Sequence, residues 1–301
     1  MKHAVELYTN QKVTEQIQLA GGFSFETWLI KLDNNQKIIF RTGMDIEVDN
    51  GKKFVVSDIF EKEDFFYKTV NNVYFNRCPK IYLIDKTNEI YHQPYQIMSF
   101  FEGDSLDKYF VHADEASKRI ILNKIGKVTA EINNIEIINS QNVFNDNPWE
   151  KKFEKKLIDR FGPLIKDMIL TDSEKMILLR KLSKLKAKTT NSLLHLDIRL
   201  PNLIYHNEEI HVIDAENCEV GDPLYELAIV AVAGMLDENF LKGYRESSIY
   251  SIDLDDTLFK YYQLERQAAL VNLFKNILNN ESLAQNTILN FDRLKRELFD
   301  T

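Results

Sequence analysis

The sequence predicts an α+β fold of two lobes: an N-terminal lobe built on an antiparallel sheet with one helix, and a C-terminal lobe that is mainly helical. Short alternating or apolar runs, broken by turn residues, fill the first hundred residues and are typical of strands. After Gly103 the segments are longer, have helical periodicity and contain few turn residues. Because no linker rich in Pro, Gly or Ser separates the halves, we expect a hinge near Gly103, with lobes at residues 1–102 and 103–301.

Length and composition are those of a globular protein. The chain has 301 residues, of which 44% are hydrophobic and 28% charged, so it can bury a substantial core. The first residues lack the apolar segment of a signal peptide, and the longest apolar run, from Leu227 to Leu236, is too short to span a bilayer. We therefore expect a cytoplasmic protein without a membrane partner. Cys78 and Cys218 lack CxxC spacing and a nearby histidine cluster, which favours free thiols over a zinc site or a disulfide.

The formal net charge of −8 bears on the choice of partners. A nucleic-acid-binding protein needs clustered Lys and Arg to neutralise phosphates, so the charge argues against that class. An acidic protein suits a neutral or cationic substrate better, although mild acidity also serves solubility alone.

The N-terminal lobe contains five runs that predict strands, at residues 16–19, 27–32, 37–41, 80–84 and 95–100. Residues 33–36 (Asp-Asn-Asn-Gln) separate the second run from the third and predict a hairpin turn. One helix is expected at about residues 57–70, because Phe60, Phe66 and Val70 lie close to helical spacing.

The C-terminal lobe has three long helical segments, at residues 113–138, 148–169 and 172–185. Two short strands are expected at 203–205 and 210–213, joined by the polar turn 206–209. Asp222 suits the N-cap and Pro223 the first position of a further helix. Two or three more helices are expected from residue 256 to the end.

A polar segment in the second half has the residues that phosphoryl transfer from a nucleotide requires. Residues 195–202 read His-Leu-Asp-Ile-Arg-Leu-Pro-Asn, and Asp214 follows the second short strand. In this spacing Asp197 would orient a substrate hydroxyl, while Asn202 and Asp214 would bind Mg2+, which prefers hard oxygen ligands. Arg199 stands where protein kinases usually have a Lys, close enough to offset charge on the moving phosphoryl group.

Any one of these residues alone would be better explained by a polar loop or a capped turn. The combination is more specific, because two strands lie between Asn202 and Asp214 and Gly221-Asp222-Pro223 follows. His195 is expected to brace the loop through hydrogen bonds rather than to do acid–base chemistry.

These motifs resemble a known family. His-x-Asp-x-x-x-x-Asn at 195–202, Ile-Asp at 213–214 and Gly-Asp-Pro-x-Tyr-Glu-Leu-Ala at 221–228 are similar to the aminoglycoside phosphotransferase-like branch of the protein-kinase superfamily. That branch also includes choline, fructosamine, homoserine and methylthioribose kinases and macrolide phosphotransferases. The match is dense from Leu194 to Ala228, and the lobe order extends it to nearly the whole chain. Ala215-Glu216 replaces the Phe-Gly of protein kinases, which disfavours a protein kinase.

The resemblance implies a phosphate-binding turn in the N-terminal lobe. Residues 21–27 (Gly-Gly-Phe-Ser-Phe-Glu-Thr) resemble the family's turn over the nucleotide phosphates, where glycines let backbone N–H groups approach the anion. Gly21, Gly22 and Ser24 are therefore candidate nucleotide contacts. A plain hairpin is the alternative.

The resemblance also implies an ion pair. Arg41 occupies the position where the superfamily usually has Lys, and its larger, forked side chain would hold phosphates differently. Its helix partner would be Glu63, or Glu61 if the register slips, and the helical spacing favours Glu63. A surface charge is the alternative for either glutamate.

Residues 97–103 (Ile-Met-Ser-Phe-Phe-Glu-Gly) resemble the strand-to-hinge passage that meets the nucleotide base. Backbone groups of Ser99, Phe100 and Phe101 are the expected contacts with adenine or guanine, because a flat base between apolar walls needs only one or two main-chain hydrogen bonds. A core strand is the alternative. Asn133 stands where the family commonly has His, at a position expected to be structural.

The sequence assigns no acceptor contacts. Several acidic residues of the C-terminal lobe could meet an amine-rich ligand, and three tyrosines could stack on a sugar or a base, but residues of these types more often belong to a solvated face or to the core. The acidic residues are Glu216, Glu219, Glu226, Asp237, Glu238, Asp253, Asp255 and Asp256; the tyrosines are Tyr244, Tyr261 and Tyr262.

The expected function is that of a Mg2+-dependent small-molecule kinase with ATP or GTP as donor. An aminoglycoside-type antibiotic is one class of hydroxyl acceptor, with antibiotic resistance as its phenotype, and a metabolite of the choline, sugar or amino-alcohol type is the other. A pseudokinase that binds nucleotide and a protein partner is a further alternative, for which Arg41 is the one feature in favour. The sequence leaves the acceptor, the choice of nucleotide and the oligomeric state open.

Overall fold

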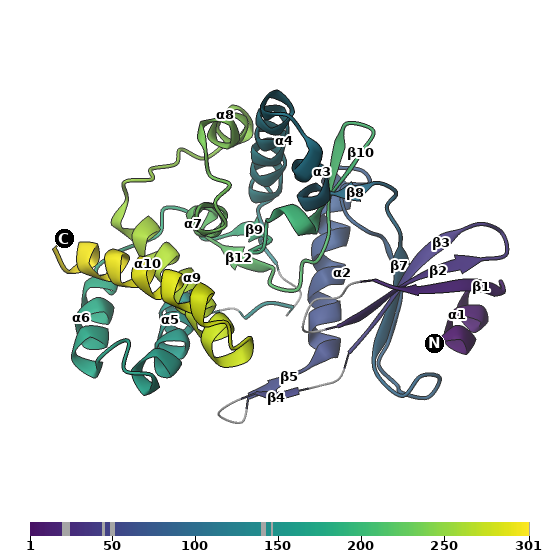
Figure 1. Cartoon of the computed structure of the whole chain (residues 1–301), viewed down its shortest axis with the longest axis horizontal. Coiled ribbons are helices and arrows are strands. Elements are labelled where there is room, and N and C mark those ends of the chain that lie inside the picture. Colours follow the sequence, from purple (N-terminus) through teal and green to yellow (C-terminus); the bar gives the residue numbers. More distant parts are fainter. Residues whose placement is uncertain (20–24, 44–45, 49–51, 140–142, 146, 301) are drawn as a thin grey trace. The chain divides into compact units, whose positions relative to one another are not determined.

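The computed structural model describes the chain except residues 20–24, 44–45, 49–51, 140–142, 146 and 301 (Figure 1). The chain forms two compact units, the first made of Met1–His112 and Leu200–Cys218, the second of Ala113–Arg199 and Glu219–Thr301. The expected lobe boundary at residue 102 stays a prediction.

The first unit is built on an antiparallel sheet of five strands, in the order β1-β2-β3-β7-β6. The strands are β1 (Val13–Gln18), β2 (Glu26–Leu32), β3 (Lys37–Thr42), β6 (Ile81–Asp85) and β7 (Tyr95–Ser99). The N-terminal antiparallel sheet is thereby confirmed, since each expected run overlaps one of these strands. The β2–β3 hairpin turns where the polar run predicts it, with Asn35 at a φ of 65°.

Helix α2 (Val56–Val73) lies along this sheet in Figure 1 and buries one face. Phe60, Phe66, Tyr67 and Val70 on that face are buried, and so is Glu63. Helical spacing therefore turns one carboxylate inward together with the apolar side chains. Smaller elements of the unit are α1 (Lys2–Thr9), α3 (Leu106–His112), β4 (Ile46–Val48), β5 (Lys52–Phe54) and β8 (Asp104–Ser105).

A second, three-stranded sheet in the first unit has the order β11-β10-β8. The 3-10 turn η1 (Leu200–Asn202) leads into β10 (Leu203–His206), which pairs with β11 (Glu209–Val212). Asn207 and Glu208 between them both have positive φ, as a tight type I′ hairpin requires. The predicted hairpin thus fixes the path of the chain from Asn202 to Asp214.

The second unit is mainly helical, as predicted. Its helices are α4 (Glu115–Asn133), α5 (Trp149–Lys166), α6 (Asp172–Leu182), α7 (Pro223–Val232), α8 (Glu238–Ser247), α9 (Thr257–Asn272), the π-helical η2 (Leu273–Ile277) and α10 (Glu281–Asp300). Strands β9 (Ser192–Leu194) and β12 (Glu219–Gly221) pair with each other. The carboxylate of Asp222 accepts the Leu224 N–H at 3.0 Å and Pro223 is the first helical residue, so the predicted start of α7 is confirmed.

Within this unit α9 and α10 lie side by side, and α4 packs closely on α8 (Figure 1). The closeness of α4 and α8 depends on glycine, because a Cβ at Gly243 would lie 1.9 Å from the Asn123 carbonyl oxygen. Among the helices of the described chain, none is both long and apolar enough to cross a membrane.

Substitution Gly243→Ala is expected to lower the free energy of unfolding by about 1–3 kcal/mol, because the added methyl group forces α8 away from α4. Chemical denaturation would measure the change. Gly162→Ala on α5 is the control, since no described atom lies within 4 Å of its Cβ and alanine favours the helix. Equal stability of the two variants would contradict the close approach of α4 and α8.

Candidate active site

A buried guanidinium is the centre of the first unit's polar cluster. Arg41 on β3 donates from Nη1 to both carboxylate oxygens of Glu63, at 2.7 and 2.9 Å. Its Nη2 donates to Oδ1 of Asp214 at 2.6 Å, and its guanidinium lies 4.0 Å from the centre of the Phe25 ring. The partner of Arg41 on α2 is thus Glu63, whereas Glu61 pairs with Lys86.

Burial opposes the charge of Arg41, but the two carboxylates outweigh it and raise the pKa of the guanidinium. Glu63 is fully buried and also accepts from the Gln96 amide at 2.9 Å and the Tyr67 hydroxyl at 3.2 Å. Arg41 therefore remains a cation, and Glu63 is held by donors on three elements.

The backbone at Asp214 has a left-handed conformation, with a φ of 64°. This conformation costs free energy in a residue with a side chain, so other contacts must hold it. The Tyr67 hydroxyl accepts the N–H groups of Asp214 at 2.9 Å and Ala215 at 3.3 Å, while Arg41 holds the carboxylate. The sequence does not indicate this role of Tyr67, because Asp214 lies far away from it along the chain.

Two oxygen donors in this unit suit a magnesium ion. The Ile213 N–H donates to the Asn202 carbonyl at 3.0 Å, which fixes the backbone of Asn202 beside the residue that precedes Asp214. An amide and a carboxylate are hard oxygen ligands, and Mg2+ takes few protein ligands because phosphates and waters complete its shell. In the described part of the chain no group of three His, Cys, Asp or Glu forms a metal site of another type. The donor set therefore fits Mg2+.

The expected base-binding segment lies at the end of β7. The Ser99 N–H donates to the Lys80 carbonyl at 2.9 Å, and the Ser99 hydroxyl accepts from the Lys80 N–H. Phe101 stacks on His211 with ring centres 4.1 Å apart, and Phe100 lies 5.4 Å from Lys37 Nζ. The Ser99 N–H is thus used within the protein, and binding of the base by Ser99, Phe100 and Phe101 stays a prediction. The expected phosphate contacts Gly21, Gly22 and Ser24 lie outside the described residues.

The second unit holds the loop that follows β9. Glu226 on α7 is fully buried and accepts the N–H of His195 at 2.6 Å and that of Leu196 at 3.0 Å. Leu196 has a φ of 61°, so its left-handed backbone is held by this carboxylate. The ring of His195 accepts the Asp197 N–H at Nδ1, at 3.2 Å, which is the bracing expected of it.

Glu226 has an unusual acidity. Burial raises its pKa to about 7, and the Asp197 charge adds to the effect, whereas the two N–H donors and Arg266 work against it. Glu226 belongs to the motif at 221–228, but nothing in the sequence indicated that it accepts the N–H groups of His195 and Leu196.

The carboxylate of Asp197 lies between two arginines. Arg199 Nε donates to Oδ2 at 2.8 Å, and Arg266 Nη2 on α9 donates to Oδ1 at 3.0 Å. Only 8% of the Asp197 side chain is exposed. Sequence reasoning did not find Arg266, because it lies far from Asp197 in the sequence and belongs to no local motif.

The structure thus brings the expected site residues together in two sets. The first unit contains Arg41, Glu63 and Asp214 in direct contact, and the second contains Asp197 and Arg199. Asn133 is structural, since its amide donates to the Leu193 carbonyl at 3.1 Å and accepts from the Tyr244 hydroxyl at 3.0 Å.

Most residues considered for acceptor binding have partners within the protein. Tyr244, Tyr261 and Tyr262 are fully buried, and their hydroxyls donate to Asn133, the Leu178 carbonyl and Asp222. Tyrosines without an exposed ring face cannot stack on a ligand.

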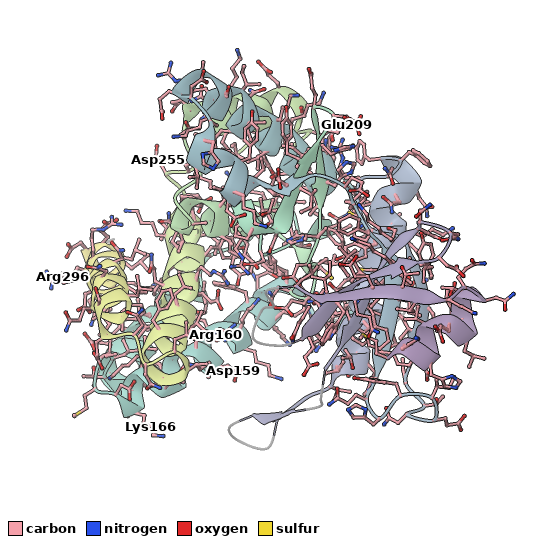
Figure 2. All side chains as sticks on the ribbon, turned by 45° about the vertical axis from the view of Figure 1, so that its right-hand side comes forward. Asp159, Arg160, Lys166, Glu209, Asp255 and Arg296 are labelled. Carbon is pink, nitrogen blue, oxygen red and sulfur yellow. The ribbon has the colours of Figure 1, made fainter. Side chains whose placement is uncertain are left out.

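The acidic residues have structural contacts of the same kind. Asp237 and Asp256 cap α8 and α9, and the others pair with cations: Glu219 with Lys152, Glu238 with Arg245, Asp253 with Lys188, and Glu216 with Arg41. Asp255 is exposed (Figure 2).

A family model described as "Phosphotransferase enzyme family" matches residues 15–257, most of the chain. No curated protein matches the sequence.

Solved structures share the fold at low sequence identity. A thermostable mutant of aminoglycoside phosphotransferase APH(4)-Ia, without ligand, has a TM-score of 0.71 and 16% identity, with 99% of each chain covered. A ternary complex of such a mutant with AMP-PNP and hygromycin B has a TM-score of 0.68, 16% identity and 98% coverage of each chain. The complex of APH(2")-IIIa with GDP and kanamycin has a TM-score of 0.66, 13% identity and 97% coverage of each chain. The predicted two-lobed, protein-kinase-like fold is confirmed.

The acidity of Glu226 makes stability depend on pH. Its pKa in the folded protein is about 7, above the ordinary 4.5. Its contribution to the free energy of unfolding is therefore complete below pH 4.5 and is lost as the pH rises through about 7. Glu226→Gln mimics the protonated form. Between pH 4.5 and about 7 the free energy of unfolding of the wild type should therefore fall by on the order of a few kcal/mol more than that of the variant. Denaturation at several pH values would measure it.

Asp222 also has a raised pKa, of about 6, mainly because of burial. It adds the same pH dependence to both proteins, so the effect of Glu226 is the difference between the wild-type and Glu226→Gln profiles. Glu238→Gln, at an exposed acid, is the control and should keep the wild-type pH dependence. A Glu226→Gln profile parallel to that of wild type would contradict the raised pKa.

Proposed function

The chain belongs to the phosphotransferase enzyme family, and from this premise we propose that it transfers the γ-phosphoryl group of ATP or GTP to a hydroxyl of a small molecule. The observation that carries the proposal is the carboxylate of Asp197. It is nearly buried, its loop is held by Glu226, and it lies five residues before Asn202 in the sequence.

In the proposed reaction the acceptor hydroxyl donates a hydrogen bond to Asp197. The hydroxyl oxygen forms a bond to the γ-phosphorus, while the bond from that phosphorus to the β–γ bridging oxygen breaks. The hydroxyl proton passes to the Asp197 carboxylate, and a nucleoside diphosphate leaves with the electron pair of the broken bond. Arg199, with 49% of its side chain exposed, is long enough to offset charge on the moving group.

Asp214 and Asn202 would hold Mg2+ through their side-chain oxygens. When bound, Mg2+ neutralises charge on the β- and γ-phosphates. Arg41 keeps Asp214 oriented, and as a permanent cation it also suits the nucleotide phosphates together with the turn at Gly21, Gly22 and Ser24.

The base would meet the backbone of Phe100 and Phe101. The solved neighbours contain AMP-PNP and GDP, so both purines remain candidate donors. We propose the cytoplasm, which supplies nucleoside triphosphates, as the location.

The neighbours also bind hygromycin B and kanamycin, which makes an aminoglycoside one candidate acceptor and antibiotic resistance its expected phenotype. A metabolite with a hydroxyl group is the other.

The position of Arg41 supports a second candidate, a pseudokinase with a protein partner. Its guanidinium is held by two carboxylates, and so is less available to phosphates than a lysine would be. The intact Asp197, Asn202 and Asp214 favour the kinase. Nucleotide binding without turnover in the presence of any hydroxyl acceptor would decide for the pseudokinase.

Asp197→Asn should lower kcat by about 10²–10⁴, because the amide orients a hydroxyl poorly and accepts no proton. Calorimetry should show unchanged affinity for Mg-nucleotide. Asp255→Asn, at an exposed acid of the same unit (Figure 2), should keep full turnover. Full turnover by the Asp197 variant would remove this residue from the chemistry.

Asp214→Ala should instead weaken binding of Mg-nucleotide by at least about tenfold, as expected for loss of a charged metal ligand. Calorimetry with and without Mg2+ separates this effect from loss of fold. An unchanged Mg2+ dependence would exclude Asp214 from the metal site.

A further inference from the structure

We propose that the acceptor carries an anionic group close to the hydroxyl that is phosphorylated, and that Arg266 binds this group. The proposal rests on the proposed function, because it places the anion beside the carboxylate that would orient the hydroxyl. The proposed acceptor differs in charge from the neutral or cationic substrate that the net charge of −8 suits.

The hydrogen bonds of Arg266 are the first observation. A guanidinium has five N–H donors, and the contacts recorded for Arg266 with the described residues use Nη2 alone, toward Asp197 at 3.0 Å. A quarter of the side chain is exposed, so Arg266 is accessible to a ligand. Arginine's planar fork matches a carboxylate or phosphate in a bidentate manner, and such charge-assisted pairs are among the strong hydrogen bonds.

The charge around Asp197 is the second observation. Arg199 and Arg266 both contact this single carboxylate, so the group of three carries a net positive charge. On the neighbouring α5, Arg160 (Figure 2) pairs with Glu265 of α9, and half-buried Lys156 lies 5.0 Å from the centre of the Tyr225 ring.

Burial lowers the pKa of Lys156, whereas Glu265 works against that shift. Glu265 is itself shared, since Arg160 and the Tyr225 hydroxyl donate to its two oxygens at 3.0 and 2.5 Å. This part of α5 and α9 thus contains three cationic side chains, Lys156, Arg160 and Arg266, and two carboxylates, Asp159 and Glu265.

The use of the acidic side chains is the third observation. A polyamine needs carboxylates that are exposed and unpaired near the reacting hydroxyl. Glu226, which accepts the N–H groups of His195 and Leu196, is fully buried, and Asp237 and Asp256 cap helices. An acceptor with several ammonium groups would therefore meet Arg199 and Arg266 without compensating acids from these positions.

The acceptor class follows from the geometry. Arg266 and the reacting hydroxyl share one carboxylate, so the anion and the hydroxyl lie a few bonds apart in the acceptor. Small hydroxycarboxylates satisfy this requirement, and so do hydroxyl compounds that already bear a phosphate. Carboxylate and phosphate both offer anionic oxygens to the guanidinium, so only a comparison of the two kinds of acceptor distinguishes them.

The test measures phosphorylation of matched acceptors by the full-length protein with Mg-ATP and Mg-GTP. The panel pairs D-glycerate with its amide and glycerol 3-phosphate with glycerol, and adds kanamycin and hygromycin B. The anionic members are expected to have kcat/KM about ten- to a hundredfold above their neutral partners, the range of one charge-assisted contact. Whichever acceptor has the higher kcat/KM, the carboxylate or the phosphate, identifies the anionic group that Arg266 binds.

Arg266→Gln then separates anion binding from simple positioning of Asp197. The variant should raise KM for the anionic acceptor at least about tenfold and abolish its advantage over the neutral partner, whereas any change in kcat should be the same for both acceptors. Arg266→Lys should recover part of the preference, since it keeps the charge without the fork. Arg296→Gln, whose side chain points outward from α10 in Figure 2, is the control and should behave as wild type.

Three results would overturn the inference. Turnover of kanamycin, hygromycin B or the neutral members above the anionic ones would reject it and leave the proposed function standing. An equal fall of kcat for anionic and neutral acceptors in Arg266→Gln, with the preference for the anionic acceptor unchanged, would make Arg266 a positioning residue only. Absence of nucleotide turnover with every acceptor would reject the proposed function and the inference together.

Discussion

Two residues with left-handed backbone, Leu196 and Asp214, set the constraint on which both parts of the candidate site depend. Neither is a glycine, so each conformation costs free energy that neighbouring contacts must offset. Buried Glu226 holds the N–H of Leu196, and the buried hydroxyl of Tyr67 holds that of Asp214. The side chains of Asp197 and Asp214 are therefore oriented by the backbone before any ligand binds.

The charges of Arg41 and Glu63 are buried for orientation rather than for stability. Moving a guanidinium and a carboxylate out of water costs several kcal/mol per ion, and the ion pair of Arg41 and Glu63 recovers this only through good geometry and additional donors. Gln96 and Tyr67 supply those donors. Such clusters are costly to build, and in an enzyme they are explained by the need to hold a carboxylate such as Asp214 in place.

The sequence predicts those features that depend on local periodicity. The five-stranded sheet, α2, the hairpin before Asp214 and the capped start of α7 all follow from spacing or turn residues, and the inward face of α2 places Glu63 opposite Arg41. Helix α1 and the short strands β9 and β12 are too short for a clear pattern. The role of Tyr67 and that of Glu226 could not be predicted, because each depends on which backbone N–H groups the fold brings to the side chain.

Arg266 shows the limit of sequence reasoning most clearly. It lies in a long helix whose pattern predicts only burial, and its partner Asp197 is far away in the sequence. The overall charge of −8 pointed to a neutral or cationic acceptor, whereas the charges next to Asp197 point to an anionic one. Net charge describes the whole surface, and salt largely screens an acceptor from exposed charges more than about 10 Å away.

The central claim is transfer of a γ-phosphoryl group to a hydroxyl. Phosphorus NMR of the protein with Mg-ATP and a pool of hydroxyl compounds tests it most directly, because phosphate esters, inorganic phosphate and nucleotides give separate signals. The account predicts a new phosphomonoester signal that grows in equal amount with the nucleoside diphosphate. Unchanged nucleotide, or release of inorganic phosphate alone, would contradict it.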